Sequence, residues 1–282
     1  MNRGFFNKAF VSYLLISVLI TISMLDPLNF SRKTSVNTRK IYNHIENELA
    51  TGGHILVDLH YGLLARTALE PQLTIIVKHL FDKNCKIVFL STSNEGPAIF
   101  KKFQLQAPDV FAGRQYGVDY VFLGSISSGE AGVASLAKSI RETVSKDYYN
   151  TPTTDYIKLP IMKNLNGAES FALAFILSIE VKIFEWYVRT WAMPYSIPLL
   201  LGTLNPTSRL AELYLNNGWV IGIIAGYEEV AEYEILAQRE GLGLNAIKAR
   251  KTAHILTVLF MIFGNFTVFY LKSKLKTLTF SS

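Results

Sequence analysis

The chain has 282 residues, of which 50% are apolar and 18% are charged, with a mean hydropathy of +0.24. This composition excludes a disordered chain or a fibre, and the single cysteine, Cys85, excludes a disulfide framework and a multi-cysteine metal site. Five of the 28 basic residues, and no acidic residue, lie in residues 1–25 and 253–282. The rest carries 23 basic and 22 acidic side chains, which argues against a nucleic-acid partner.

An uncharged run occupies residues 9–25 and follows a basic start. As a helix rising about 1.5 Å per residue it would span about 25 Å, slightly less than a hydrocarbon core of about 30 Å. We therefore expect an N-terminal membrane anchor over residues 1–28. A cleaved signal peptide is the alternative, but the run is long for one and no small-residue cleavage site follows it.

A second apolar stretch, residues 252–271, contains no Asp, Glu, Lys or Arg. A buried helix of a soluble domain is the alternative, but the stretch is apolar all round and leads into a basic tail, residues 273–282. We expect a C-terminal transmembrane helix over residues 252–272. Gly264 and Asn265 are its candidates for contact with another membrane protein or with a second copy of the chain.

Two spans would place both termini on one side of the membrane and residues 29–251 on the other. The terminal side carries five basic residues near the spans and the domain side carries eight. Because basic residues favour the cytoplasmic side, the domain is expected in the cytoplasm.

Between the spans, six short apolar runs alternate with helix-length segments. The expected strands are residues 54–61, 85–92, 119–126, 171–179, 197–203 and 219–226. Helices are expected over residues 35–50, up to about 83, 129–146, 183–191, 206–216 and 228–239. Runs that are continuously apolar indicate strands covered on both faces, so the pattern predicts an α/β domain with a doubly wound, mainly parallel sheet.

The least regular passage is residues 147–170, which contain Pro152 and Pro160. A segment of this length between regular elements is either an insertion over the edge of the sheet or a loop that lines the mouth of a site. The sequence leaves both possibilities open.

Candidate ligand-binding residues follow from the predicted sheet alone. In open α/β sheets, ligands bind beyond the carboxyl ends of the strands, where helix N-termini present free N–H groups. The residues in such positions are Asp58, His60, Ser93, Glu95, Gly124, Ser127, Ser128, Gly129, Glu130, Thr203, Asn205 and Tyr227.

The segment GSISSGEAG, residues 124–132, is the richest of these turns. Its small residues would let backbone amides approach an anion, but it matches neither a dinucleotide-binding motif, a P-loop nor a nucleophile elbow. A tight turn with a serine helix cap is the alternative interpretation. In residues 204–210, capping by Asn205 or Thr207 is likewise the alternative to a ligand contact.

Asp58 and His60 stand two residues apart in a predicted strand, so their side chains share one face and could cooperate. A role of His60 in proton transfer competes with that of an ordinary hydrogen-bonded histidine. No nucleophile is tied to either residue, so no catalytic residue is assigned.

Two further groups carry weaker signals. Glu228 and Glu232 could hold a metal at helical spacing, but no third ligand is identifiable, and a solvated acidic first turn explains them better. Trp186, Tyr187 and Trp191 are expected to pack in the core or at a membrane interface rather than to stack on a cofactor. The sequence therefore identifies no metal and no cofactor.

Several segments together resemble an uncharacterised prokaryotic family of membrane-anchored α/β proteins. They are Glu95-Gly96-Pro97, YGVDYVFLG (116–124), DYYNTP (147–152), AEYE (231–234) and AHILTVLFMIFGN (253–265). The resemblance covers most of residues 50–265 and implies a Rossmann-like domain with one transmembrane helix at each end. It implies no activity. The chain departs from the family pattern at residues 60–64 and 178–182, in two loops that face a ligand, which favours a degenerate, partner-binding role.

These observations favour a non-catalytic module that binds a small ligand or a protein partner at the membrane. A membrane-associated hydrolase or transferase acting through the strand-end loops is one alternative. An accessory subunit of a transporter or secretion complex is the other. Convergence of the strand-end residues in one pocket would favour an enzyme, whereas co-purification of a larger membrane protein would favour a subunit.

Overall fold

The computed structural model describes residues 34–126 and 128–278. The predicted N-terminal span therefore lies outside the described residues. Contacts divide the chain into two units, one of which is the α/β domain, Thr34–Leu244. The other unit contains the helix that continues from residue 245.

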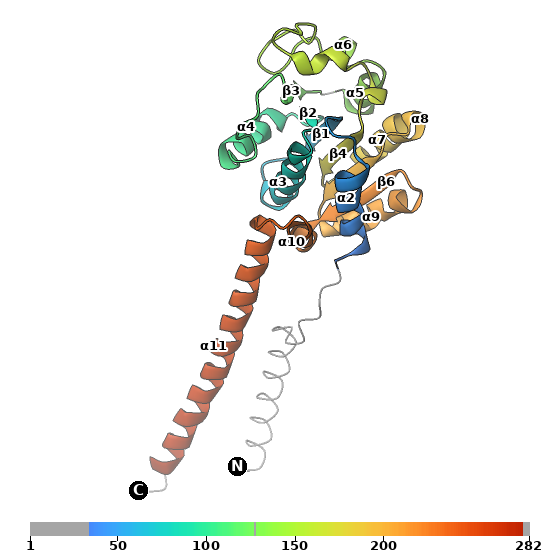
Figure 1. The fold of residues 1–282 in the computed structure, drawn as a ribbon. Coiled ribbons are helices and arrows are strands. Elements are labelled where there is room, and N and C mark those ends of the chain that lie inside the picture. The colour runs from blue at the N-terminus through green and yellow to red at the C-terminus, as the bar shows by residue number, and fades with distance from the viewer. Residues whose placement is uncertain (1–33, 127, 279–282) are drawn as a thin grey trace. The chain divides into compact units, whose positions relative to one another are not determined.

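The domain contains one parallel sheet of six strands, in the order β3-β2-β1-β4-β5-β6 (Figure 1). The strands are β1 (His54–His60), β2 (Lys86–Ser91), β3 (Tyr120–Ser125), β4 (Leu173–Ser178), β5 (Leu199–Thr203) and β6 (Val220–Ala225). Each lies within two residues of its predicted bounds, which confirms the prediction of a parallel α/β sheet. The order is that of the Rossmann fold.

Helices and helical turns connect the strands. The α-helices are α2 (Val36–Asn43), α3 (Arg66–Asp82), α4 (Gly96–Gln106), α5 (Gly129–Lys138), α6 (Ile140–Thr143), α7 (Val181–Tyr187), α8 (Met193–Tyr195), α9 (Asn205–Asn216), α10 (Gly226–Leu236) and α11 (Leu242–Leu278). Short π- or 3-10 turns are η1 (His44–Glu48), η2 (Pro160–Asn164), η3 (Ala168–Ser170) and η4 (Val188–Ala192).

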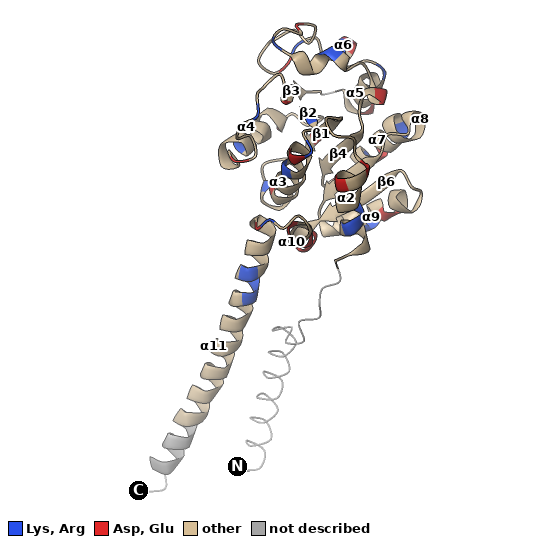
Figure 2. Ribbon diagram, viewed as in Figure 1, with Lys and Arg blue, Asp and Glu red and all other residues tan. Residues whose placement is uncertain are grey.

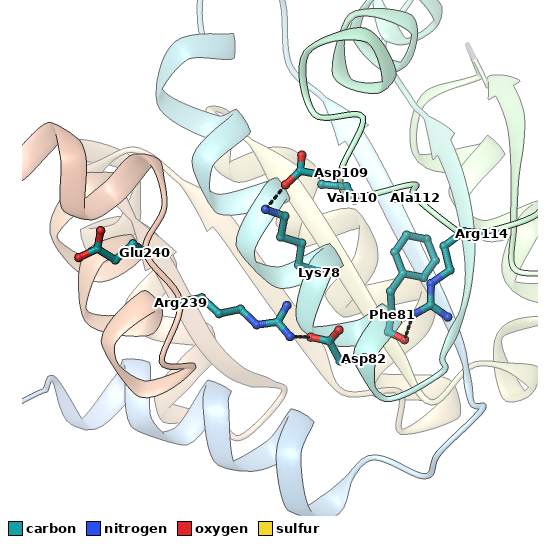
Figure 3. A pocket seen from close by; sticks show the side chains of 9 residues that line it. All are labelled: Lys78, Phe81, Asp82, Asp109, Val110, Ala112, Arg114, Arg239 and Glu240. Carbon is teal, nitrogen blue, oxygen red and sulfur yellow. Dashed lines mark hydrogen bonds and ion pairs between the residues drawn. The ribbon is translucent and has the colours of Figure 1, made fainter.

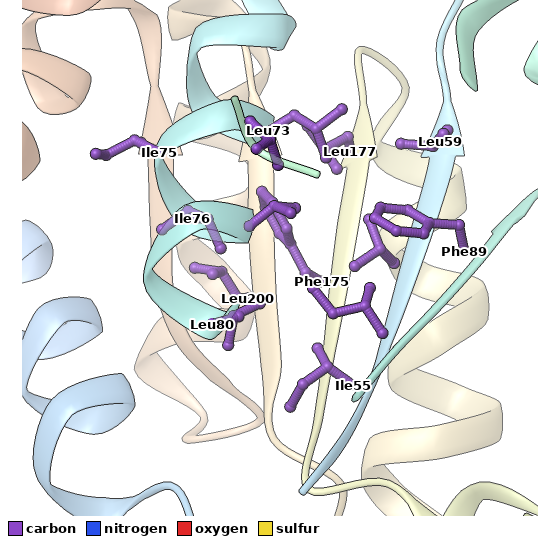
Figure 4. Packing of buried hydrophobic residues seen from close by; sticks show 14 of the residues in the cluster. Ile55, Leu59, Leu73, Ile75, Ile76, Leu80, Phe89, Phe175, Leu177 and Leu200 are labelled. Carbon is purple, nitrogen blue, oxygen red and sulfur yellow. The ribbon is translucent and has the colours of Figure 1, made fainter. Parts of the chain in front are cut away.

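Alternate residues of each strand point into two separate hydrophobic cores, one on each face of the sheet. α2, α3, α4 and α10 cover the first face, where Phe175 lies beside α3 (Figure 4) and Phe89 packs against Phe100 and Phe103 of α4. α5, α6, α7 and α9 cover the second face, which includes Leu56 and Ile176. Burial on both faces explains why the strands read as continuous apolar runs.

Two predicted helices are interrupted. The segment predicted over 129–146 breaks at Ser139, which is extended (φ −157°) and caps α6 through its hydroxyl oxygen. The segment predicted over 35–50 begins as α2, where Ser35 accepts a hydrogen bond from the amide of Thr38, and ends as a π-turn. Caps and local turns of this kind shift helix bounds without changing the pattern of apolar residues.

The irregular passage, residues 147–170, lies against the edge strand β3. The amide of Tyr148 donates to the carbonyl oxygen of Phe122 (3.0 Å), and the amide of Ile161 donates to that of Gly117 (2.9 Å), which precedes β3. Met162 and its neighbours are buried in the second core. The passage is therefore an insertion over the sheet edge, and its alternative interpretation as a loop lining the mouth of the site is wrong.

One described helix is long and apolar enough to cross a membrane by length and composition, the segment Leu242–Leu271 of α11. The sequence predicts two such helices, and the structure shows one within the described residues. α11 begins ten residues before the predicted start, and three of its basic residues, Lys248, Arg250 and Lys251, lie in its first turns (Figure 2).

Candidate functional site at the carboxyl ends of the strands

The strand order places the candidate site between β1 and β4. β1 leads to α3 on the first face of the sheet, whereas β4 leads to α7 on the second. The two segments therefore part beyond the paired residues His60 and Ser178. Ligands of open α/β sheets bind at such a switch point.

Asp58, near the end of β1, is fully buried and receives three hydrogen bonds. Its Oδ1 accepts from the amide of Thr92 (2.9 Å), and its Oδ2 accepts from the hydroxyls of Thr92 (2.7 Å) and Tyr187 (2.9 Å). Burial raises the pKa of the Asp58 carboxyl group, while nearby His60 and the three donors offset part of that rise. Three donors thus converge on this one carboxyl group.

His60 joins this network through the same hydroxyl group. Its Nδ1 lies 2.7 Å from Oγ1 of Thr92. Thr92 has one hydroxyl proton, and that proton is donated to Asp58, so Nδ1 of His60 must carry the proton of this contact. In that tautomer the neutral ring has an unprotonated Nε2, which is a hydrogen-bond acceptor. Asp58 and His60 share one face of β1, as their spacing predicts.

Glu180 and Trp186 face this imidazole from the segment after β4. Nε2 of His60 lies 3.9 Å from Oε1 of Glu180, beyond hydrogen-bond distance, and the Trp186 ring meets the His60 ring edge to face at 6.4 Å. The other oxygen of Glu180 pairs with Lys182 at 2.7 Å. That hydrogen bond is the main reason that the pKa of Glu180 lies below its ordinary value.

The loop after β2 is held by its own polar side chains. The carbonyl oxygen of Ser93 accepts hydrogen bonds from the hydroxyls of Ser91 and Ser125, each at 3.0 Å. The carboxylate of Glu95 accepts from the amide of Leu63 (2.9 Å), which ties the loop after β1 to the loop after β2. Ser93 and Glu95 thus hold in place the loop that follows Thr92, the hydrogen-bond partner of His60.

The turn after β3 contains two glycines in the left-handed region, Gly124 (φ +86°) and Gly129 (φ +57°). Ser128 occupies the helix N-cap position, but its side chain makes no capping hydrogen bond, so the predicted serine cap is wrong. Glu130 pairs with Arg189 at 2.9 and 3.1 Å, which links α5 to η4. Ser127 lies outside the described residues.

Gly129 also approaches the site. A Cβ atom at Gly129 would lie 3.8 Å from the ring of Trp186, the same ring that meets His60. His60 and Gly129 therefore lie around one point, the ring of Trp186.

The predicted residues of β5 and β6 lie apart from this point. Tyr227 donates its hydroxyl to the carbonyl oxygen of Thr67 (2.6 Å), and Asn205 packs against Gly226. Thr203 is fully buried, and its hydroxyl has no hydrogen-bond partner among the described residues. The helix that follows begins after Leu204 without a side-chain cap, so capping by Asn205 or Thr207 is also wrong.

Sequence reasoning missed three members of the site. Tyr187 is expected in the core or at a membrane interface; it is buried in the core, but its hydroxyl also binds Asp58. Trp186, on the same helix, is half-buried, packs against the second core and also meets the ring of His60. The position of Glu180 directly after β4, whose end pairs with that of β1, is the signal that could have identified it.

A cavity of about 480 Å³ lies elsewhere, around the last turn of α3 (Figure 3). α3 begins near the carboxyl end of β1 and ends near the amino ends of the strands. This cavity therefore lies at the end of the strands opposite to the candidate site. Four of its charged groups form two ion pairs, Lys78 with Asp109 and Arg239 with Asp82, each at 2.5 Å. These pairs hold α3 to neighbouring segments.

Comparison of the chain with protein-family models, curated proteins and solved structures found no match. Within the described residues, no cluster of three or more His, Cys, Asp or Glu side chains could hold a metal ion. The site must therefore be interpreted from its own geometry.

Proposed function

We propose that the protein is a membrane-anchored, non-catalytic module that binds a small ligand at the switch point between β1 and β4. The observation that carries this proposal is the chain of hydrogen bonds from Asp58 through Thr92 to His60. It fixes the imidazole and leaves Nε2 as an oriented acceptor. A fixed acceptor beside an aromatic ring is the kind of group that orients a ligand in a pocket.

Binding fits this geometry better than hydrolysis or group transfer. A hydrolase of the serine type requires a hydroxyl nucleophile that donates to the histidine base. Among the described residues, no hydroxyl group is bonded to Nε2 of His60, and the hydroxyl of Thr92 is donated to Asp58. The alternative, a membrane-associated hydrolase or transferase, would need a nucleophile from the ligand or from a residue outside this network.

The membrane part of the proposal is supported by α11. The stretch within it that contains no Asp, Glu, Lys or Arg, residues 252–271, would span about 30 Å, and three basic residues precede it. We include in the proposal a second anchor in residues 1–28, a cytoplasmic domain, and kinship with the membrane-anchored α/β family. The departures at residues 60–64 and 178–182 contain His60 and Glu180 themselves, so the ligand would differ from that of the family.

A dialysis experiment tests this function. The full chain in lipid nanodiscs is dialysed against a bacterial metabolite extract, and the retained compounds are measured by mass spectrometry. We expect at least one compound to be retained by the wild type and by a His44→Gln control, and lost from His60→Gln. His44 is bonded to Glu48 on η1, away from the site. Equal retention by all three proteins, or by none, would contradict the proposal.

A further inference from the structure

We propose that the ligand carries a primary ammonium group, which binds between Nε2 of His60 and Oε1 of Glu180 and against the ring of Trp186. This inference deepens the proposed function and rests on it. It assigns a chemical class to a ligand for which the fold alone gives none.

The distance between the two acceptors is the first argument. Nε2 of His60 and Oε1 of Glu180 are 3.9 Å apart, too far for a hydrogen bond between them. One nitrogen donor can lie about 2.9 Å from both atoms at once, and about 2.9 Å is the usual distance between donor and acceptor atoms in an N–H hydrogen bond. An ammonium group has three N–H donors and can satisfy both acceptors while keeping one for water.

The charges of His60 and Glu180 also favour an ammonium group. Glu180 is ionised at neutral pH, because its hydrogen bond with Lys182 holds its pKa low. Nε2 of neutral His60 carries a lone pair. A carboxylate or phosphate would meet two acceptors here and would be repelled, whereas a cation is attracted to both. Two protein ligands are too few for a structural metal site, which requires three or four.

Lys182 shows that this carboxylate binds an ammonium group. Its Nζ lies 2.7 Å from Oε2 of Glu180, whereas Nε2 of His60 lies nearest to the other oxygen, Oε1. Lys182 is exposed, and it competes with a cationic ligand for the charge of Glu180. Removal of Lys182 should therefore strengthen the binding of a cationic ligand.

Aromatic and acidic groups around the crevice also suit a cation. Trp186 is half-buried with its ring next to His60, and indole rings attract ammonium groups within about 6 Å. The charged groups on the adjoining elements are Glu130, Glu185 and Arg189, which are paired with one another. Together with Glu180 and Lys182 they leave a net negative charge beside the crevice.

The test uses n-butylamine as probe, with 1-butanol and butyrate as neutral and anionic compounds of matched length. The full chain in nanodiscs is labelled with ¹⁵N-histidine, and the Nε2 signal of His60 is followed during each titration. We expect butylamine to shift this signal saturably, Glu180→Gln to weaken binding at least tenfold, and Lys182→Gln to tighten it severalfold. Both variants change exposed side chains and should fold normally.

The outcomes separate the inference from the proposed function. If butyrate or butanol shifts the His60 signal at lower concentration than butylamine, the ammonium assignment is wrong although the site binds ligands. If butylamine leaves the signal unchanged, the assignment is wrong as well. If no compound of the metabolite extract depends on His60 for retention, the proposed function itself fails.

Discussion

Asp58 and His60 lie two residues apart on one face of β1 and are joined through a single hydroxyl group, that of Thr92. The carboxylate determines which way the hydroxyl proton points, and the hydroxyl then determines which nitrogen of the imidazole is protonated. The buried Asp58 thus determines which ring nitrogen of the more exposed His60 carries the proton.

Asp58→Asn should reverse the direction of the hydrogen bonds that run between Asp58, Thr92 and His60. The amide of Thr92 requires an acceptor, so the carbonyl oxygen of the new side chain would face it and the NH₂ group would donate to the Thr92 hydroxyl. Thr92 would then donate to Nδ1 of His60, and the proton of the ring would move to Nε2. Nitrogen-15 spectra of labelled histidine measure the tautomer. An unchanged Nδ1–H form in the variant would contradict the prediction.

Thr92→Val should destabilise the domain by about 1–3 kcal/mol, because Oδ2 of Asp58 and Nδ1 of His60 each lose a buried partner. Urea unfolding of the full chain in detergent measures the change. The matched control is Thr143→Val, which removes a hydroxyl bonded only to the carbonyl oxygen of Ser139 in a half-buried turn. Equal losses of unfolding free energy in the two variants would contradict a stabilising role of the hydrogen bonds between Asp58, Thr92 and His60.

His79 should make stability depend on pH. It is buried between the hydroxyl of Tyr233 (2.6 Å) and Glu46 (2.8 Å), and so joins α3 to α10 and η1. Burial lowers the pKa of His79 below its ordinary value, and Glu46 opposes the shift. A depressed histidine pKa means that stability is complete above the unfolded-state value of about 6.5 and is lost as the pH falls through the folded-state pKa.

Unfolding free energies measured from pH 8 downward test this prediction. We expect the wild type to lose stability below about pH 6.5 and His79→Gln to show a flatter profile in that range. Because the pKa of Glu46 lies below its ordinary value of 4.5, loss of its contribution is expected only in more acidic solution. Parallel profiles for the two proteins between pH 7 and 5 would contradict the role of His79.

Glu234 should hold the first turn of α11. It is buried, and its carboxylate oxygens accept from the amides of Gly243 (2.9 Å) and Leu244 (2.7 Å). Loss of such a contact at a helix N-terminus costs about 0.5–2 kcal/mol. Glu234→Ala should therefore speed hydrogen exchange at these two amides, whereas the exposed control Glu212→Ala should not. Unchanged exchange in Glu234→Ala would mean that the turn is held by other contacts.

The sheet could be predicted from the sequence because strands buried on both faces need apolar residues at nearly every position, and those of β1, β2 and β4 leave little ambiguity. Helix bounds were less predictable, since the break at Ser139 depends on one local cap. The sequence favours a solvated face for the acidic residues of α10, Glu228, Glu229, Glu232 and Glu234. That interpretation is wrong for Glu232, which binds the amide of Ser35, and for Glu234, which binds the amide of Gly243.

The site was predicted in part. Asp58 and His60 were found because they end an apolar strand at the edge where ligands bind. Their connection through Thr92 depends on the pairing of β1 with β2, and their neighbours Glu180 and Trp186 depend on the pairing of β1 with β4. Strand order is a property of the whole chain, so the sequence pattern of one strand does not contain it.

The protonation state of His60 in the wild-type protein tests the account most directly. Nitrogen-15 spectra of the full chain in nanodiscs at pH 7.5, with His60 assigned by the His60→Gln variant, report which ring nitrogen carries the proton. We predict that the neutral form of the ring carries its proton on Nδ1 and leaves Nε2 free. A proton on Nε2 would contradict the relay from Asp58 and, with it, the proposed ligand site.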